Sequence, residues 1–225
     1  MAQQTVLAVC AHPDDEILGA GATLAKHLAQ GDRVCFVFMT DGEAARGSFD
    51  GAEARRHAAY GATTAIGASK DDICFFDFPD NRLDTVAMLD LAQAIEKTVE
   101  RFRPRVIYTH HRGDLNVDHR LTHQAVLTAC RPVPDSTVHA IYGFEVLSST
   151  EWASPSADNA FIPVHYVDIV DFWDQKLAAL KAYDHEMRTF PHARSYEAVE
   201  ALAKLRGAHV GLEKAEAFSV IHQRG

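Results

Sequence analysis

Strand-like apolar runs alternate with helix-like segments along the first 144 residues, and this alternation restricts the fold more than any other feature of the sequence. Residues 5–11 (TVLAVCA) form a nearly continuous apolar run, which is typical of a strand covered on both faces. Residues 19–30 follow with apolar side chains at helical spacing, and Gly31 ends the segment. Strands separated by helices of this length form βαβ units, so we predict an α/β fold: a three-layer α/β/α, Rossmann-like domain with a mainly parallel, doubly wound sheet.

The same pattern predicts the remaining elements. Further strands are expected at residues 34–40, 72–78, 105–109 and 138–144, and further helices at 52–66, 86–102 and 119–130. The pattern then loosens, and we expect a polar loop at 148–160, strands at 165–169 and 216–221, and helices at 171–183 and 195–206. No internal repeat or linker is visible. The chain is therefore expected to be one domain, residues 1–225, with an elaborated C-terminal third from about residue 145.

Composition excludes several classes of protein. With 47% hydrophobic and 24% charged residues, the chain is not disordered. Twenty-two Lys and Arg against thirty-one Asp and Glu give a formal net charge of −9, which argues against binding to nucleic acid. No apolar run approaches the roughly 20 residues of a membrane helix, so no stable membrane insertion is expected. The four cysteines form no Cys-x-x-Cys pair and no secretory signal precedes them, which predicts reduced core thiols in a cytoplasmic protein.

Ionisable and polar residues gather directly after the expected strands. They are His12, Asp14, Asp15 and Glu16 after the first strand, Asp41 and Glu43 after the second, Asp80, Asn81 and Arg82 after the third, His110, His111, Asp114, Asn116, Asp118 and His119 after the fourth, and Glu145 after the fifth. Ligands of open parallel sheets bind outside the carboxyl ends of the strands. We therefore expect five turns to converge on one functional rim.

The first and fourth of these turns have the residues of a catalytic metal site. In residues 11–16 (AHPDDE), His12 and Asp15 are three residues apart across a turn stiffened by proline and can face one point. Residues 110–119 (HHRGDLNVDH) offer a third ligand from a helix start. Two histidines and one carboxylate leave positions open on a metal, as in catalytic zinc sites. Zinc would bring the pKa of its water towards about 7, and an adjacent carboxylate could accept the proton during attack on a carbonyl.

These two segments resemble the PIG-L-type (LmbE-like) zinc-dependent N-deacetylases. That family carries Ala-His-Pro-Asp-Asp-Glu after its first strand and an Asp-His pair at the start of a later helix, which residues 11–16 and 118–119 match. Further matches follow in the same order: Thr40-Asp41-Gly42-Glu43, Arg55-Arg56 and Phe78-Pro79-Asp80. The resemblance covers at least the first 130 residues. It implies hydrolysis of the acetamido group of a small-molecule N-acetylated amino sugar or sugar conjugate, releasing acetate and a free amine, and leaves a homo-oligomer possible.

The resemblance also implies roles for individual residues. His12, Asp15 and His119 would hold one zinc ion, with Fe²⁺ or another divalent metal as the alternative, and Asp14 would be the general base.

Four further residues are expected to contact substrate. Arg56 and Asp80 match positions where the family binds substrate, and Arg55 is the alternative register for the arginine. Asn81 and Glu145 are expected at the same rim because each follows a strand end.

The chain departs from the family pattern just before the last metal ligand. Residues 116–119 read Asn-Val-Asp-His, where the family has His-Pro-Asp-His. The amide of Asn116 can stabilise an oxyanion but cannot deliver a proton. Either protonated Asp14 or His111 would then protonate the leaving amine, and Asp118 would orient the neighbouring groups.

Other functions share parts of this pattern. A zinc amidohydrolase could act on a non-sugar N-acyl substrate such as an antibiotic or thiol conjugate. Non-haem Fe(II) oxygenases also use two histidines and one carboxylate, although they usually present His-x-Asp on a β-sandwich. A non-catalytic sugar-binding protein would have no need of a base beside the metal.

Two local motifs suggest other sites that the sequence does not support. Gly19 and Gly21 form Gly-x-Gly near a helix start, but the third glycine of a dinucleotide motif is missing and nearby carboxylates would repel a pyrophosphate. His119 and His123 have metalloprotease spacing, but Arg120 stands where that motif needs Glu.

Overall fold

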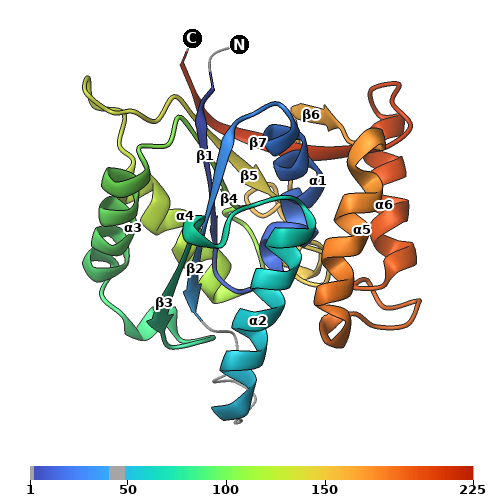
Figure 1. Cartoon of the computed structure of the whole chain (residues 1–225), viewed down its shortest axis with the longest axis horizontal. Coiled ribbons are helices and arrows are strands. Elements are labelled where there is room, and N and C mark those ends of the chain that lie inside the picture. Colours follow the sequence, from blue (N-terminus) through green and yellow to red (C-terminus); the bar gives the residue numbers. More distant parts are fainter. Residues whose placement is uncertain (1–2, 41–48, 225) are drawn as a thin grey trace.

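The computed structural model describes residues 3–40 and 49–224, and seven strands of this part form one sheet in the order β3-β2-β1-β4-β5-β7-β6 (Figure 1). The strands are β1 (Thr5–Cys10), β2 (Arg33–Thr40), β3 (Ile73–Phe78), β4 (Val106–His110), β5 (Ala140–Phe144), β6 (His165–Asp168) and β7 (Ala215–Gln223). Strands β1 to β5 pair in parallel, and β7 runs antiparallel to both β5 and β6. The sheet is therefore mainly parallel, as predicted.

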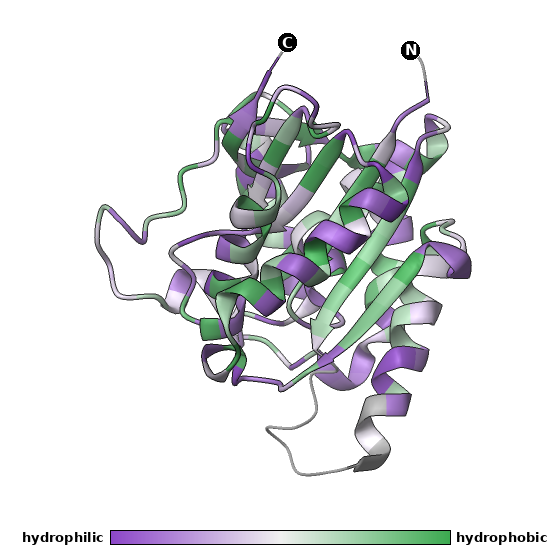
Figure 2. Cartoon of the chain, turned by 90° about the vertical axis from the view of Figure 1, so that its left-hand side faces the viewer, coloured by the Kyte–Doolittle hydropathy of each residue, from purple (hydrophilic) through white to green (hydrophobic). Residues whose placement is uncertain are grey.

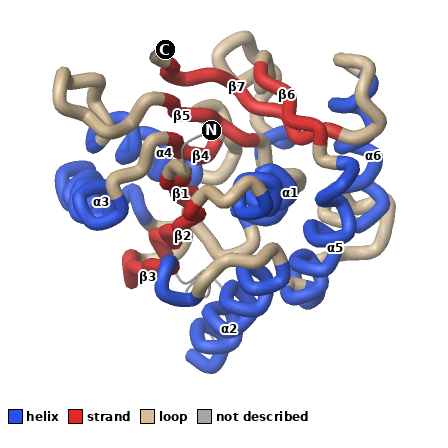
Figure 3. Tube along the Cα trace, turned by 45° about the horizontal axis from the view of Figure 1, so that its top comes forward, coloured by secondary structure: helices blue, strands red, loops and turns tan. Residues whose placement is uncertain are grey.

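Helices cover both faces of this sheet (Figure 3). They are α1 (Asp15–Ala29), α2 (Phe49–Ala65), α3 (Met88–Phe102), α4 (Val117–Ala129), α5 (Trp173–Ala182) and α6 (Tyr196–Ala208). Short 3₁₀ turns connect them: η2 (Lys70–Asp72), η3 (Leu83–Thr85), η4 (Thr150–Trp152), η5 (Val170–Phe172) and η6 (Asp184–Glu186). Helices α3 and α4 pack on one face, while α1, α2, α5 and α6 pack on the other. The three-layer α/β/α fold is confirmed.

The two faces of the sheet carry separate hydrophobic cores, which explains the continuous apolar runs of the central strands. In β1, Val6, Ala8 and Cys10 pack into one core, whereas Leu7 and Val9 pack into the other. Hydrophobic residues accordingly fill the strands, and hydrophilic ones lie mainly on the outer faces of the helices (Figure 2). None of the helices described is long and apolar enough to cross a membrane.

Helix α1 begins four residues before its predicted start. Its first turn contains Asp15 and Glu16, whose charges favour the positive end of a helix but interrupt the apolar spacing. Further along, α1 approaches β5 closely at Gly19, where a Cβ atom would lie 2.3 Å from Cδ2 of Phe144. Close packing therefore accounts for this glycine.

A buried ion pair contacts backbone groups in the middle of α1. Lys176 Nζ on α5 lies 2.6 Å from Glu216 Oε1 on β7 and also donates to the carbonyl of Leu18 at 3.0 Å. The Glu216 carboxylate accepts the backbone N–H groups of Ala22 at 3.1 Å and Thr23 at 2.7 Å. In a regular helix the N–H of Ala22 would donate to the carbonyl of Leu18. Here the ion pair forms hydrogen bonds with both of these groups and so ties α1 to α5 and β7.

The strand order reverses between β1 and β4. The chain runs from β1 to β2 and β3 on one side, then returns to place β4 and β5 on the other side of β1. Such a reversal opens a crevice at the carboxyl ends of the two strands, where open α/β sheets bind ligands. The turns after β1 and β4, which contain the candidate metal ligands, both lie here.

Candidate active site and metal centre

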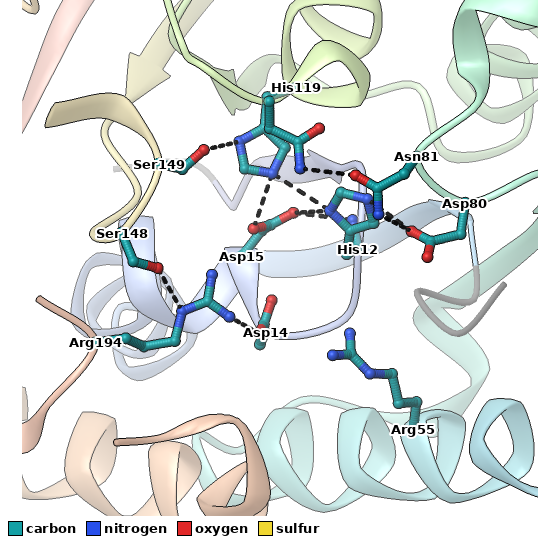
Figure 4. A pocket seen from close by; sticks show the side chains of 11 residues that line it. His12, Asp14, Asp15, Arg55, Asp80, Asn81, His119, Ser148, Ser149 and Arg194 are labelled. Atoms are coloured by element: carbon teal, nitrogen blue, oxygen red, sulfur yellow. Dashed lines mark hydrogen bonds and ion pairs between the residues drawn. The ribbon is translucent and has the colours of Figure 1, made fainter. Parts of the chain in front are cut away.

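A polar pocket of about 140 Å³ lies at the carboxyl ends of β1 and β4 (Figure 4). It is lined by His12, Asp14, Asp15, Arg55, Asp80, Asn81, Asn116, His119, Ser148, Ser149 and Arg194. The pocket is also where the backbone is most strained. Of the four non-glycine residues with positive φ in the described part of the chain, three line it: Asp14, Asn81 and Ser148. Strained backbone of this kind clusters at functional sites.

The three predicted metal ligands meet at one point of the pocket. His119 Nε2 lies 3.3 Å from His12 Nδ1 and 3.3 Å from Asp15 Oδ1, and His12 Nδ1 lies 3.3 Å from Asp15 Oδ2. Ligand atoms bound tetrahedrally to zinc at its usual N and O distances are roughly 3.3–3.4 Å apart. The three residues therefore fit a divalent ion in their present positions, since all three side chains are buried and close together.

The other ring nitrogen of His12 faces two carboxylates. Its Nε2 lies 3.1 Å from Asp80 Oδ1 and 3.2 Å from Asp118 Oδ2. Asp118 also accepts the backbone N–H groups of Asn81 at 2.7 Å and Leu83 at 3.1 Å. A proton on Nε2 leaves the lone pair of Nδ1 directed at the metal position, as in many carboxylate–histidine–zinc arrangements. Hydrogen bonding to Nε2 thus accounts for the closeness of His12, Asp80 and Asp118.

His119 is oriented by Asp114, which the sequence places at the functional rim without a specific role. Its Nδ1 lies 3.2 Å from Asp114 Oδ1, and Asp114 in turn accepts the hydroxyls of Ser149 and Thr150 and the backbone N–H of Asn116. Burial alone would lower the pKa of His119, but the carboxylates of Asp15 and Asp114 raise it to about 9. Carboxylates therefore surround the histidines of the site, and their negative charge favours a bound cation.

Asp14 lies beside the three ligands with its backbone in an unusual conformation. It precedes α1 with φ of 115°, a value that costs energy for any residue except glycine. Its N–H donates to Glu16 Oε2 at 3.0 Å, and Glu16 Oε1 accepts the hydroxyl of Tyr183 at 2.7 Å. Asp14 Oδ2 accepts Arg194 Nη1 at 2.7 Å. Burial raises the pKa of Asp14, although the guanidinium of Arg194 opposes the shift.

Three other predicted residues also lie at the pocket. Asn116 caps α4, because its Oδ1 accepts the N–H of Asp118 at 2.8 Å, while its Nδ2 donates to Asn81 Oδ1 at 3.4 Å. Asp80 is buried next to them and accepts a hydrogen bond from the Asn81 amide at 3.2 Å. These contacts bring Asn116, Asp80 and Asn81 to the rim of the pocket on the side of His12.

The structure does not bring three predicted residues to the pocket. His111 Nε2 lies 2.9 Å from the carbonyl of Asn159, and His111 lines a different cavity. Glu145 forms two 2.7 Å bonds with Arg206.

The third of these residues is Arg56, which pairs with Asp77 at the surface. Its neighbour Arg55 is buried and lines the pocket instead. Consecutive residues of a helix point about 100° apart, so only one of the two arginines can face the site. Asp41 and Glu43, from the motif after β2, lie outside the described residues.

The outer wall of the pocket comes from the C-terminal third of the chain. Arg194 Nε donates to Ser148 Oγ at 2.9 Å, and Glu186 on η6 lies 2.5 Å from Arg55 Nη2. Arg55 Nη1 also donates to the carbonyl of Pro13 at 3.3 Å. No periodicity or motif in the sequence marks these residues, because their positions depend on how irregular segments fold back over the sheet.

Known proteins with similar sequences and folds agree with this geometry. The family model of PIG-L, described as GlcNAc-PI de-N-acetylase, matches residues 7–130. The uncharacterized deacetylase YaiS of Escherichia coli K12 is 30% identical over 184 residues, which cover 79% of this chain and 89% of YaiS. The 4-oxalmesaconate hydratase of Pseudomonas putida KT2440 is 30% identical over 204 residues, covering 80% of this chain and 72% of the hydratase.

Among solved structures, the fold is similar to that of N,N'-diacetylchitobiose deacetylase from Pyrococcus horikoshii. The TM-score is 0.76 at 20% sequence identity, and the superposition covers 97% of this chain and 84% of the other. The family match spans more than half of the chain and contains the three candidate metal ligands. The resemblance read from the two motifs is thereby confirmed, and the chain belongs to the PIG-L family.

Proposed function

We propose that this protein is a zinc-dependent hydrolase that removes the acetyl group from an N-acetylated amino sugar or sugar conjugate. Membership of the PIG-L family and the similarity to the deacetylase YaiS support N-deacetylation. The sugar is suggested by the description of the family and by the chitobiose deacetylase that shares the fold.

One observation carries the proposal. His119 Nε2 lies 3.3 Å from His12 Nδ1 and from Asp15 Oδ1, and His12 Nδ1 lies 3.3 Å from Asp15 Oδ2. The carboxylate of Asp14 lines the same small pocket. A site that only held a structural metal would have four protein ligands and no need of an extra carboxylate beside them.

The residues of the pocket can be assigned to the steps of amide hydrolysis. When bound, zinc polarises a carbonyl and makes water more acidic. Asp14 accepts a proton from water as its oxygen attacks the acetyl carbon, and Arg194 fixes one Asp14 oxygen so that the other is available. The amide N–H of Asn116 stabilises the negative oxygen.

The C–N bond then breaks, and the nitrogen must gain a proton. His111 is occupied with Asn159, and the geometry therefore favours return of the proton from Asp14. Acetate and a free amine leave.

A panel of acetylated compounds tests this function. Zinc-loaded protein is incubated with N-acetylglucosamine, N,N'-diacetylchitobiose, sugar nucleotides and non-sugar N-acyl conjugates, and acetate and free amine are measured together. Equal release of both from a sugar supports the proposal. Release from non-sugar compounds alone would make the protein a different amidohydrolase. Oxygen consumption with Fe²⁺, or binding of sugar without turnover, would contradict hydrolysis.

A hydratase is the second candidate, because one relative with 30% identity is a hydratase. Arg55 and Arg194 both line the pocket, and guanidinium groups bind the carboxylates of such substrates well. Glu186 and Asp14 already pair with these arginines, which favours the deacetylase. Incubation with 4-oxalmesaconate, followed by loss of its conjugated absorbance, decides between the two reactions.

A further inference from the structure

Two segments that form the outer wall of the pocket each carry an exposed aromatic side chain just beyond it. Trp152, at the end of η4, is 52% exposed, and His192 precedes the pocket residue Arg194 by two positions. Their ring centroids are 5.6 Å apart with the ring planes at 77°. Neither ring lines the pocket itself.

Hydrogen bonds hold this aromatic pair to the pocket wall. The backbone N–H of Trp152 donates to the carbonyl of Ser149 at 3.2 Å. The ring of His192 accepts the backbone N–H of Arg194 at 3.0 Å, and Arg194 bonds to Ser148 at 2.9 Å. Ser148, Ser149 and Arg194 are pocket residues, so both rings belong to segments that border the pocket.

The pocket is too small to enclose a whole sugar conjugate. Its volume is about 140 Å³, whereas pockets that enclose a small molecule usually measure roughly 300–1,000 Å³. Under the proposed function, the pocket would hold the acetamido group and part of its ring. Any unit joined to that ring must leave the pocket across the outer edge or the opposite side.

The exposed indole supplies what the polar pocket lacks. Among the described residues, none that lines the pocket is Phe, Tyr or Trp, so none of these can stack an aromatic ring on the apolar face of a sugar. An indole offers a large, rigid surface of this kind with little loss of side-chain freedom. The edge-to-face contact with His192 fixes its position without burying it.

We propose that Trp152, supported by His192, forms a second subsite that binds a sugar ring attached to the N-acetylated sugar in the pocket. The inference rests on the proposed deacetylase function and narrows its substrate class to compounds of at least two rings. Trp152 acts on specificity and not on the bond that breaks.

Steady-state kinetics with one-ring and two-ring substrates test this subsite. For Trp152→Ala, KM for N,N'-diacetylchitobiose should rise roughly threefold to tenfold, while KM for N-acetylglucosamine and kcat for both stay close to those of the wild type. Trp152→Phe retains an aromatic ring and should avoid most of this rise in KM. Leu89→Ala, which removes an exposed apolar side chain from α3, is the matched control and should change neither substrate.

The outcomes separate the subsite from the function. An equal rise in KM with both substrates would show that Trp152 only supports the position of Ser149, and would overturn the subsite. No rise in KM with either substrate would also overturn it. If the wild type releases acetate from no sugar compound of the panel, the proposed function fails, and binding alone decides the subsite.

Tryptophan fluorescence provides that binding measurement. The chain has two tryptophans, and Trp173 is buried in the core. Zinc-loaded Asp14→Asn protein, which should bind without turnover, is titrated with N,N'-diacetylchitobiose. A saturable change in fluorescence supports the subsite if N-acetylglucosamine does not cause it and Trp152→Phe abolishes it. A change that survives this substitution, or no change, overturns it.

Discussion

Asp14 and Asp15 are neighbours in sequence with the same side chain, yet the fold gives them different partners. Asp15 is the first residue of α1 and faces His12 and His119, whereas Asp14 has a left-handed backbone and faces Arg194. The sequence motif predicts that both belong to the site. Their separate contacts follow from the positive φ of Asp14, which directs its side chain away from that of Asp15.

Asp14→Asn should lower kcat for acetate release by about 10²–10⁴-fold, because the amide cannot accept the proton of water. Bound zinc, measured by atomic absorption, should stay near one equivalent. Asp15→Asn is the matched control and should lose zinc and activity together. Loss of zinc from Asp14→Asn would mean that the roles of the two carboxylates are reversed.

The two adjacent arginines allow a similar comparison. Arg55→Ala removes a buried guanidinium that bonds to Glu186 and to Pro13, and we expect kcat/KM to fall about tenfold to 100-fold. Arg56→Ala removes only a surface pair with Asp77 and should stay within about twofold of the wild type. A larger fall in kcat/KM for Arg56→Ala than for Arg55→Ala would indicate that Arg56 is the residue that contacts the substrate.

The choice between Arg55 and Arg56 shows which structural information the sequence pattern does not contain. Helical periodicity places α2 to within a few residues, but α2 has no strong apolar stripe that fixes which side faces the sheet. His111 illustrates the same limit at a strand end. It follows the last residue of β4, and the loop at Asn159 determines where its ring lies.

At the scale of elements, α1 begins at the candidate metal ligand Asp15 and directly follows the proposed base Asp14, so its placement controls the site. Apolar periodicity located the helix, and the parallel order of strands located the rim. The pattern could not show that Gly19 faces Phe144 or that Lys176 and Glu216 reach into the helix, because these contacts join residues far apart in the chain. The contact with Phe144 explains Gly19, one of the two glycines that resemble a nucleotide motif.

Gly19→Ala should destabilise the protein by about 1–3 kcal/mol, since its Cβ would overlap the ring of Phe144. Gly61→Ala in α2 is the matched control. There the new Cβ meets only Ala182 Cβ at 3.4 Å, and better helix propensity should stabilise the protein by up to about 1 kcal/mol. Urea denaturation measures both changes. Equal effects would show that α1 can move away from β5.

Lys176→Met tests the buried ion pair. It removes the ammonium while the Glu216 carboxylate stays buried, and the expected loss of stability is about 3–5 kcal/mol. Lys204→Met breaks a largely exposed pair with Glu200 and should cost less than about 1 kcal/mol. If Lys176→Met has an equally small effect in urea denaturation, water replaces the ammonium at the carbonyl of Leu18.

At the scale of the whole molecule, the metal site joins the turn after β1 to the start of α4. The carboxylates of Asp15, Asp80, Asp114 and Asp118 are all buried within this small region. A cation that binds only the folded chain must therefore stabilise the entire domain.

Zinc at about 100 times its Kd should stabilise the protein by about 2.7 kcal/mol, which corresponds to a rise in Tm of about 5–10 °C for a chain of this length. His119→Ala should lose most of this rise. Calorimetric scans of the chelated and zinc-loaded proteins measure it. An unchanged rise in the variant would place the bound zinc elsewhere.

The wall formed by Ser148, Glu186 and Arg194 has a consequence for how this protein can diversify. The candidate metal ligands and the proposed base lie in the segment that matches the family, residues 7–130, while the outer boundary of the pocket is built from later residues. Mutations in that boundary that retain Arg194, the partner of Asp14, can alter which molecules enter and leave the proposed catalytic groups untouched. Exchange of segments 145–160 and 184–195 between relatives, with Arg194 kept, is thus a direct route to enzymes with new selectivity and an inherited reaction.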